Sequence, residues 1–533
     1  MKSFSVILVF ILAAFSAVAQ TDTNAIVVPA ETHAPAFPPA TNGVAAPMDM
    51  STVAAPVGRN AATREMSLED CIREALQHNL DVQIERYSPQ VSLYNLRSAY
   101  GGYDPLFNIS GQHDFNVSPG GFTSQQIPIP STTSKSDSFN SGINGLLPWG
   151  LQYDFTGNIA DRNFMSSPNS TESSSGSIGV QLTQPLLKNF WFDSTRLTIQ
   201  VAKNRLKYSE QGLRLQVITS ITDVENAYYE LIYAQENVKV QQQALELAQT
   251  QLDQDRQRVQ IGTLAQLDVQ QDGAQVATSR ANLIAAQSTF NTAQNTLKNL
   301  LTDEYLRWHD KDIQPTATIT NAPLQLFDLQ DSWSKGLTER PDLLQARLDV
   351  EKQGIQLKFD RNQLFPELDL IGTYGYNGAA REFSGAFNQF NEGDRPFYSY
   401  GAQLSVPLSN VKARNTFKSD KVTMQQFVLT LKQFEQNIMV EIDNAVKQAQ
   451  SAYESVNATR QARIYAEAAL DAEQKKYAVG KSTTFIVLQL QNTLTADRAQ
   501  EIRSLANYYE ALAKLAQQEG STLERNHINI EVK

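Results

Sequence analysis

The sequence predicts a mixed α+β membrane protein, built by internal duplication, in which a transmembrane β-barrel continues into long helices. Three observations favour this fold class. Nearly the whole chain is written twice, each copy carries segments that alternate apolar and polar residues, and each copy ends in helical runs too long for a globular core. Charged residues make up 19% of the 533 residues, a composition that excludes a helical membrane protein with several apolar spans of about 20 residues.

The N-terminus has the order of a secretory signal peptide, predicted at 1–19. Lys2 precedes an apolar run, and Ala17 to Ala19 form a small-residue cleavage site before Gln20. Residues 20–65 are rich in Ala, Pro and Thr and lack any hydrophobic period, so we expect a disordered leader. The signal predicts export from the cytoplasm.

The internal repeat covers almost all of the remaining chain. LEDCIREALQHNL from Leu68 aligns with LQDSWSKGLTERP from Leu329, and GVQLTQP from Gly179 aligns with GAQLSVP from Gly401. The order of matching segments is kept throughout, which chance rarely gives. The predicted organisation is a first repeat at 66–301, an inter-repeat segment at 302–328, a second repeat at 329–519 and a tail at 520–533.

Strands are expected at about 105–186 and 366–408. Apolar and aromatic residues alternate there with polar ones, as in FNISGQHDFNV from Phe107 and YSYGAQLSV from Tyr398. Strands of about ten residues with one apolar and one polar face fit a lipid-facing barrel with a wet lumen, although a soluble β-sandwich has the same period. The signal peptide and the aromatics near the strand ends favour the barrel.

Long helices are predicted at 193–260 and 410–479, each followed by a second helical run, at 264–300 and 482–519. The first run contains one glycine and no proline, and the second contains neither. A helix of about 68 residues is roughly 100 Å long, so it needs partners along its length. Each copy therefore ends in a helical hairpin with a tight tip.

Closure of the barrel requires more than one chain. The two duplicated strand hairpins supply four strands, whereas the smallest membrane barrels have eight. Strand edges left open in lipid would leave backbone groups unpaired. The chain is therefore expected to oligomerise and to share one barrel and one helical tube.

With these features the sequence resembles the outer-membrane efflux protein family, the TolC type. The resemblance rests on the duplicated unit, on FPELDL from Phe365 and GVQLTQPLL from Gly179, and on the tips IGTLAQLDV and VGKSTTFIVL. It implies a homotrimer in the outer membrane of a Gram-negative-type bacterium, with a twelve-stranded barrel continued by a twelve-helix periplasmic tunnel. It also implies a periplasmic adaptor, an inner-membrane pump that acts through it, and an equatorial part from 302–328 and 520–533.

The resemblance also assigns roles to the two tips. The expected adaptor contacts are Ile261, Gly262, Thr263, Val479, Gly480 and Lys481, and the glycines also permit the turns. The family's inward-facing aspartates after the second tip fall here on Ile486 and Gln489. The first copy retains acidic residues at the corresponding place, Asp268 and, one turn later, Asp272. We expect the periplasmic entrance or gate to be formed by Asp268, Asp272, Ile486 and Gln489. A basic residue expected at Ser482 is absent, so a salt-bridge latch would lack its cation at this position.

The first copy also contains an insert between its strands. FNSGINGLLPWGLQYDFTGNIA from Phe139 is typical of a further hairpin, at 137–161. It either extends the extracellular mouth or enlarges the barrel beyond twelve strands. The first arrangement is favoured because the barrel is expected to stand on twelve helices.

The predicted function is a passive exit duct of a tripartite efflux or type I secretion system, without a cofactor and without a catalytic role. The alternative is a secreted coiled-coil structural or adhesive protein with soluble β domains. An enzyme is disfavoured because Asp104, Glu367 and Asp369 lie on polar strand faces. The net charge of −11 disfavours nucleic acid, and the single cysteine, Cys71, excludes an intrachain disulfide. The histidines show no metal-ligand spacing, being His33, His78, His113, His309 and His527.

Overall fold

The computed structural model describes residues 62–166, 169–319, 321–323, 325 and 327–528. These residues belong to one of the two units into which the chain divides, 60–533. The predicted signal peptide at 1–19, most of the predicted leader at 20–65 and the end of the tail lie outside the described residues.

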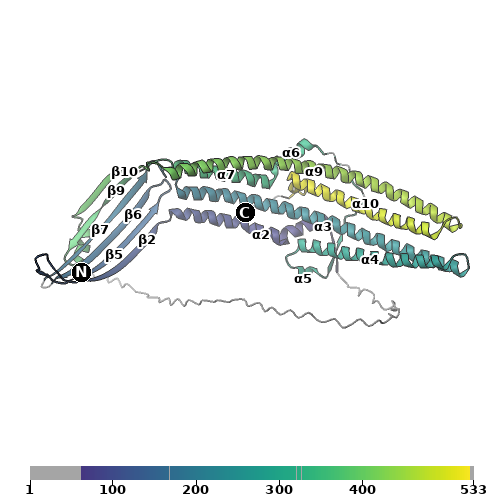
Figure 1. The fold of residues 1–533 in the computed structure, drawn as a ribbon, viewed down its shortest axis with the longest axis horizontal. Helices are drawn as coiled ribbons and strands as arrows, with labels where there is room; N and C mark the ends of the chain where they lie inside the picture. The colour runs from purple at the N-terminus through teal and green to yellow at the C-terminus, as the bar shows by residue number, and fades with distance from the viewer. Residues whose placement is uncertain (1–61, 167–168, 320, 324, 326, 529–533) are drawn as a thin grey trace, which may run out of the picture. The chain divides into compact units, whose positions relative to one another are not determined.

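The first repeat runs from a short strand through a sheet to a helical hairpin (Figure 1). Its elements in chain order are β1 (Ala62–Met66), α1 (Leu68–His78), α2 (Leu80–Ala99), the 3₁₀ turn η2 (Tyr100–Tyr103), β2 (Leu106–Ser118), β3 (Gly121–Phe122), β4 (Pro128–Ile129), β5 (Thr132–Leu146), β6 (Gln152–Ser166), β7 (Asn169–Pro185), α3 (Ser194–Gln260) and α4 (Gln266–Leu301).

The second repeat follows the same order after a connecting segment. The connecting segment contains α5 (Tyr305–Trp308) and β8 (Lys311–Pro315). The elements of the second repeat are α6 (Leu329–Glu339), α7 (Pro341–Asn362), β9 (Glu367–Ala380), α8 (Phe383–Glu392), β10 (Pro396–Ser405), α9 (Val411–Ala478) and α10 (Thr484–Glu519), and α11 (Thr522–Arg525) lies in the tail.

The main sheet contains six strands in the order β10-β9-β7-β6-β5-β2, and every neighbouring pair is antiparallel. Because direct cross-strand partners share a face, the register assigns the side chains to two faces. One register row is apolar and consists of Phe107, Ile143, Phe155, Val180, Tyr374 and Tyr398. A row on the opposite face is polar and consists of Ser110, Asn140, Asn158, Ser177 and Asn377.

The extra hairpin lies in this sheet, so the favoured expectation that it extends the mouth is wrong. β5 and β6 are inserted between β2 and β7 and pair along their full lengths. That expectation assumed that a barrel standing on twelve helices must have twelve strands. A strand is only about 5 Å from its neighbour, whereas packed helices are about 8–10 Å apart, so the two numbers need not agree. The chain supplies six strands to the sheet instead of four.

The short helix α8 packs on the apolar face near the far end of the strands. The Phe383 ring lies 6.0 Å from that of Phe139, and Ala386 is fully buried. A Cβ atom on Gly378 would meet the Ala386 carbonyl oxygen at 2.3 Å, so glycine permits this approach. The polar face is therefore not the one that α8 covers.

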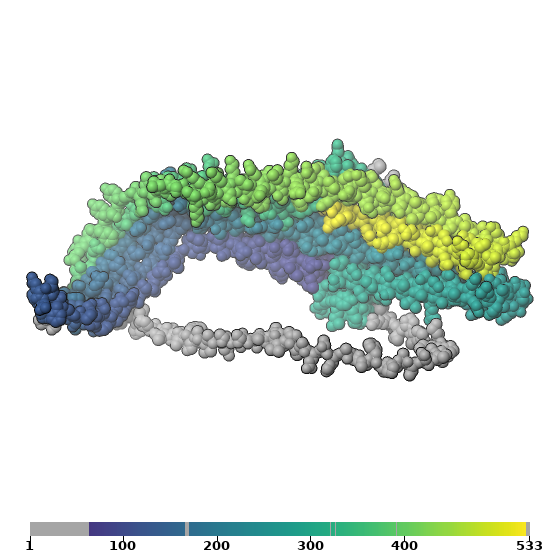
Figure 2. All heavy atoms as spheres, viewed as in Figure 1, coloured from purple at the N-terminus to yellow at the C-terminus, as the bar shows by residue number. Residues whose placement is uncertain are grey.

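Four helical columns extend from the sheet. α2, α3, α7 and α9 contact one another in that order, and the two hairpins α3–α4 and α9–α10 continue beyond α2 and α7. α9 and α10 lie side by side over the length of α10 (Figure 2). α3 and α9 run without interruption because no proline breaks them.

The main apolar core lies within the first repeat and the segment that follows it, around Tyr228, Leu231, Leu297 and Leu301, all fully buried. β1 pairs in parallel with β8 at its edge. Residues 62–65, expected to belong to a disordered leader, are therefore part of a strand. Their partner is far away in the sequence, so no local pattern signals this pairing.

Candidate functional site

The two helical tips are tight turns built in the same way. Gly262 and Gly480 adopt positive φ angles of 78° and 76°. The Thr263 amide donates to the Arg258 carbonyl at 2.9 Å, and the Lys481 amide donates to the Lys476 carbonyl at 2.9 Å. These bonds satisfy the last carbonyls of α3 and α9, as in a glycine C-cap.

The apolar residues before these glycines are left in solvent. Ile261 is 73% exposed and Val479 is 67% exposed. Thr263 and Lys481 are also exposed. Each tip thus presents one large apolar side chain beside a polar one, at the end of the hairpin farthest from the sheet (Figure 1).

Replacing Gly480 by alanine should loosen the second tip. A non-glycine residue in the left-handed region costs about 1–2 kcal/mol, and here no neighbouring atom lies within 4 Å of the added Cβ to cause a clash. Faster hydrogen exchange of the tip amides is expected. The matched control is Gly273→Ala inside α4, where the added Cβ also meets nothing within 4 Å and helix propensity predicts slower exchange.

A buried polar cluster lies just inside the tips and joins all four helices of the two hairpins. The Tyr477 hydroxyl of α9 donates to the Asp255 carboxylate of α3, 2.8 Å from each oxygen, and lies 2.9 Å from the Thr484 hydroxyl of α10. Gln251 donates to Asp255 at 2.8 Å. Asp272 of α4 completes the cluster, and both aspartates are fully buried.

The Asp272 carboxyl is buried beside the Asp255 carboxyl without a compensating hydrogen bond. Among the described residues, no hydrogen-bond donor reaches either oxygen of Asp272. Burial and the adjacent Asp255 carboxyl raise the pKa of Asp272 to about 7. The Asp268 carboxylate adds a smaller effect in the same direction. The Arg258 guanidinium is 3.6 Å from Asp255 and lies over the Tyr477 ring, so it balances one negative charge.

The predicted entrance residues fall in different environments. Asp268 is half-buried in the first turn of α4, whereas Asp272 is enclosed by the cluster. Ile486 is 41% exposed, and Gln489 is exposed on the next turn of α10. The structure therefore brings Asp272 to the tip cluster and leaves Asp268, Ile486 and Gln489 on the surface.

Sequence reasoning missed Asp255, Tyr477 and Thr484. Asp255 stands in the polar run DQDRQR, which reads as a solvated face. Its burial depends on contact between two hairpins from different repeats, which no spacing within one helix reports. The nearest signal was Tyr477, a large aromatic residue three positions before the tip glycine.

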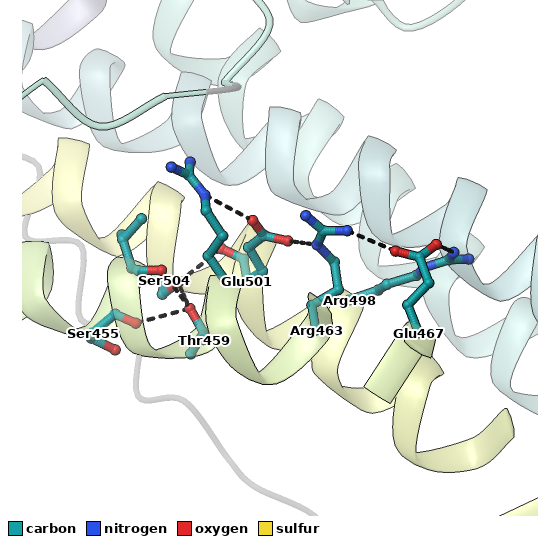
Figure 3. Close-up of polar contacts among 9 residues, drawn as sticks. Ser455, Thr459, Arg463, Glu467, Arg498, Glu501 and Ser504 are labelled. Carbon is teal, nitrogen blue, oxygen red and sulfur yellow. Dashed lines mark hydrogen bonds and ion pairs between the residues drawn. The ribbon is translucent and has the colours of Figure 1, made fainter. Parts of the chain in front are cut away.

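A second polar network connects α9 to α10, farther from the tip than the cluster at Asp255 (Figure 3). Glu501 of α10 accepts from Arg463 and, at 3.3 Å, from Arg460 of α9. Arg498 of α10 donates to Glu467 of α9 at 2.8 Å. The α9–α10 hairpin is thus held as a unit, and the cluster at Asp255 connects that unit to α3–α4.

Exposed apolar residues follow the two outermost helices. On α2 they recur every three or four residues and form what we name the α2 stripe: Leu80, Ile84, Tyr87, Val91 and Tyr94, between 52% and 66% exposed. On α9 the corresponding α9 stripe consists of Val411, Val422, Leu429 and Val440, which share one face at offsets of 11, 7 and 11 residues. Such stripes are typical of helices that pack against another chain.

No helix among the described residues has the length and apolar character needed to cross a membrane. Within the same residues, no group of three or more His, Cys, Asp or Glu side chains is placed to hold a metal ion. Cys71 is buried.

A sheet with one apolar and one polar face, continued by paired helices that end in exposed tips, defines a channel-type protein of the outer membrane. The sequence model of the outer membrane efflux protein family matches residues 151–302 and 333–521. The chain belongs to this family, whose members are transport channels of the bacterial outer membrane.

Individual relatives agree with this assignment. The chain is 25% identical over 393 residues to outer membrane protein TolC of Escherichia coli, covering 70% of this chain and 74% of the relative. It is 23% identical over 322 residues to outer membrane efflux protein BepC of Brucella suis, covering 60% and 67%. The solved outer-membrane channel OprN is similar in fold, with a TM-score of 0.64 at 16% identity over 85% of this chain and 90% of that chain.

Proposed function

We propose that three copies of this chain close into one duct, which carries cargo from a periplasmic adaptor to the cell exterior. The observation that carries the proposal is that each unpaired edge strand of the sheet lies on the same side of the chain as an outermost helix. β2 and α2 form one side of the described unit, and β10 and α9 form the other. Family membership supports the transport role, and the relatives' names support the outer-membrane setting.

The two open sides complement each other. β2 and β9 both start from the helical end and run away from it, whereas β10 returns, so β10 of one copy is antiparallel to β2 of the next. The α2 stripe faces the α9 stripe of the neighbouring copy in the same closure. Apolar side chains that are exposed in one chain are then buried between two chains, at about 25 cal/mol per Å².

The proposed partners meet the duct at its helical tips. Ile261 and Val479 offer apolar contacts to a periplasmic adaptor, and Thr263 and Lys481 offer polar ones. The adaptor in turn receives cargo from an inner-membrane pump, which supplies the energy. The duct itself is proposed to be passive and to use neither a catalytic residue nor a cofactor.

The proposed entrance is lined by Asp268, Ile486 and Gln489, and the buried Asp272 lies behind these residues and positions the helices that carry them. Three copies of Asp268 would form a carboxylate ring that favours cations. Asp268→Ala should therefore reduce the cation preference in planar bilayers, measured as a reversal potential. Gln489→Ala, an exposed neutral position on the facing hairpin, should leave the preference unchanged, and an unaltered reversal potential in Asp268→Ala would remove the ring from the entrance.

The duct itself is tested by reconstitution and complementation. The purified protein should migrate as a trimer in detergent and give discrete conductance steps in planar bilayers. Co-expressed with its adaptor and pump, it should restore extrusion of their cargo to a strain whose own exit duct has been deleted. A stable monomer in detergent without conductance would overturn the proposal.

A further inference from the structure

The six-stranded sheet has a consequence for the size of the pore. The six strands β2, β5, β6, β7, β9 and β10 form one continuous antiparallel sheet, and the β5–β6 hairpin is fully part of it. The turn between β5 and β6 lies at the helical end, where the Arg196 guanidinium of α3 donates to the Pro148 carbonyl. The hairpin is thus anchored at the base of the sheet and does not project from its rim.

We propose that the β5–β6 hairpin widens the outer-membrane section of the duct into an eighteen-stranded barrel, which admits large hydrated polar cargo. This inference rests on the proposed closure by three copies. Six is an even number, so β10 and the next copy's β2 still meet antiparallel after insertion of the hairpin.

The estimated diameters differ clearly. For strands about 4.8 Å apart and tilted by about 40°, eighteen strands give a backbone diameter of about 36 Å, and twelve strands give about 24 Å. A side-chain layer of roughly 5 Å on each wall leaves a lumen of about 26 Å in the first case and about 14 Å in the second. The hairpin therefore almost doubles the free width.

The width of the four helical columns in each chain agrees with the width of six strands. Each tilted strand occupies about 6 Å of circumference, so six strands span about 38 Å. The four columns α2, α3, α7 and α9 span about 32–40 Å at the usual helix separation. Four strands would span only about 25 Å and would narrow the duct where it enters the membrane.

The lining also suits hydrated cargo. The polar register row through Ser110, Asn140, Asn158, Ser177 and Asn377 faces the lumen in this closure, because the apolar row must face lipid. α8 lies on the apolar side and leaves the lumen open. Asp154, Glu367 and Asp369 lie on the same face, so this lining combines short polar side chains with carboxylates.

The inference is tested first by access from outside intact cells. Asn140→Cys should react with maleimides carrying polymers of increasing size, up to a cut-off set by the lumen. Its neighbour Ser141→Cys, on the apolar face, should stay unreactive toward the same polar reagents. Deleting residues 132–166 joins β2 to β7, which remain antiparallel, and Ser177→Cys in that background should show a clearly smaller polymer cut-off than Ser177→Cys in the full chain.

A second measurement does not depend on the deletion variant. Paired cysteines at Ser110 and Asn140, and at Asn158 and Ser177, are direct cross-strand neighbours. Their Cα atoms should be about 4.5–5.5 Å apart, within the range for a disulfide. Both pairs should form disulfides in the membrane-inserted protein.

The outcomes separate the two proposals. Trimers in native mass spectrometry with both disulfides and the smaller cut-off after deletion support the wide barrel. Trimers that lack these disulfides, or whose cut-off is unchanged by the deletion, overturn the wide barrel and leave the exit duct standing. A different number of copies overturns the proposed closure and the eighteen strands together.

Discussion

Substituting Asp272 by asparagine should remove most of the pH response of the helical tips. In the wild type the pKa of Asp272 is raised to about 7, from a usual value of 3.8, by burial and by Asp255. The protonated Asp272 carboxyl therefore stabilises the cluster fully below the usual pKa of 3.8. This stabilisation is lost as the pH rises through about 7, because the buried carboxylates of Asp255 and Asp272 then repel each other. Asparagine stays neutral at every pH, so it does not repel the Asp255 carboxylate.

The measurement is the distance between spin labels at Ile261→Cys and Val479→Cys, one on each tip. At about pH 8 the wild-type distances should lengthen and broaden relative to about pH 5, and in Asp272→Asn they should keep their low-pH distribution. Asp268→Asn is the matched control, since Asp268 is half-buried and should leave the response in place. A full pH response in Asp272→Asn would contradict the assignment of that response to Asp272.

Placing glutamates in the α2 stripe should prevent stable assembly. Ile84→Glu combined with Val91→Glu replaces two exposed apolar side chains that the proposed closure buries. Each lost burial weakens one interface by about 1.5–3 kcal/mol, so the pair weakens it by roughly 3–6 kcal/mol before any cost of burying the new charges. Native mass spectrometry should then show monomers where the wild type gives trimers.

The control for this variant is Gln90→Glu on the same helix. It adds a charge at an exposed position outside the stripe. It should leave the trimer intact. If the double variant also remains a stable trimer, the α2 stripe is not the contact between copies.

The parts of this fold that are repeated or periodic were accessible from the sequence. The proline-free runs that end at Gly262 and Gly480 correspond to α3 and α9 with their tips. The alternation around Phe107 and Tyr398 corresponds to the two faces of the sheet. Each of these signals is local, because it arises from backbone propensity or from one buried face.

The features that the sequence did not reveal depend on contacts between distant segments. Period two identifies β5 and β6 as strands but carries no information about which strands they join. Asp255 and Tyr477 carry ordinary helix-surface signals and meet only because two hairpins from different repeats pack together. The same applies to 62–65, whose strand exists only through its pairing with β8.

The pairing of β1 with β8 also bears on how the protein reaches its folded state. The Thr316 hydroxyl and amide both donate to the Met66 carbonyl, across 250 residues of chain. A chain that is exported from its N-terminus must keep β1 unpaired until all of the first repeat has followed it. Contacts of such high sequence separation form slowly, so completion of this small sheet is expected to be a late event in maturation, after the first helical hairpin has formed.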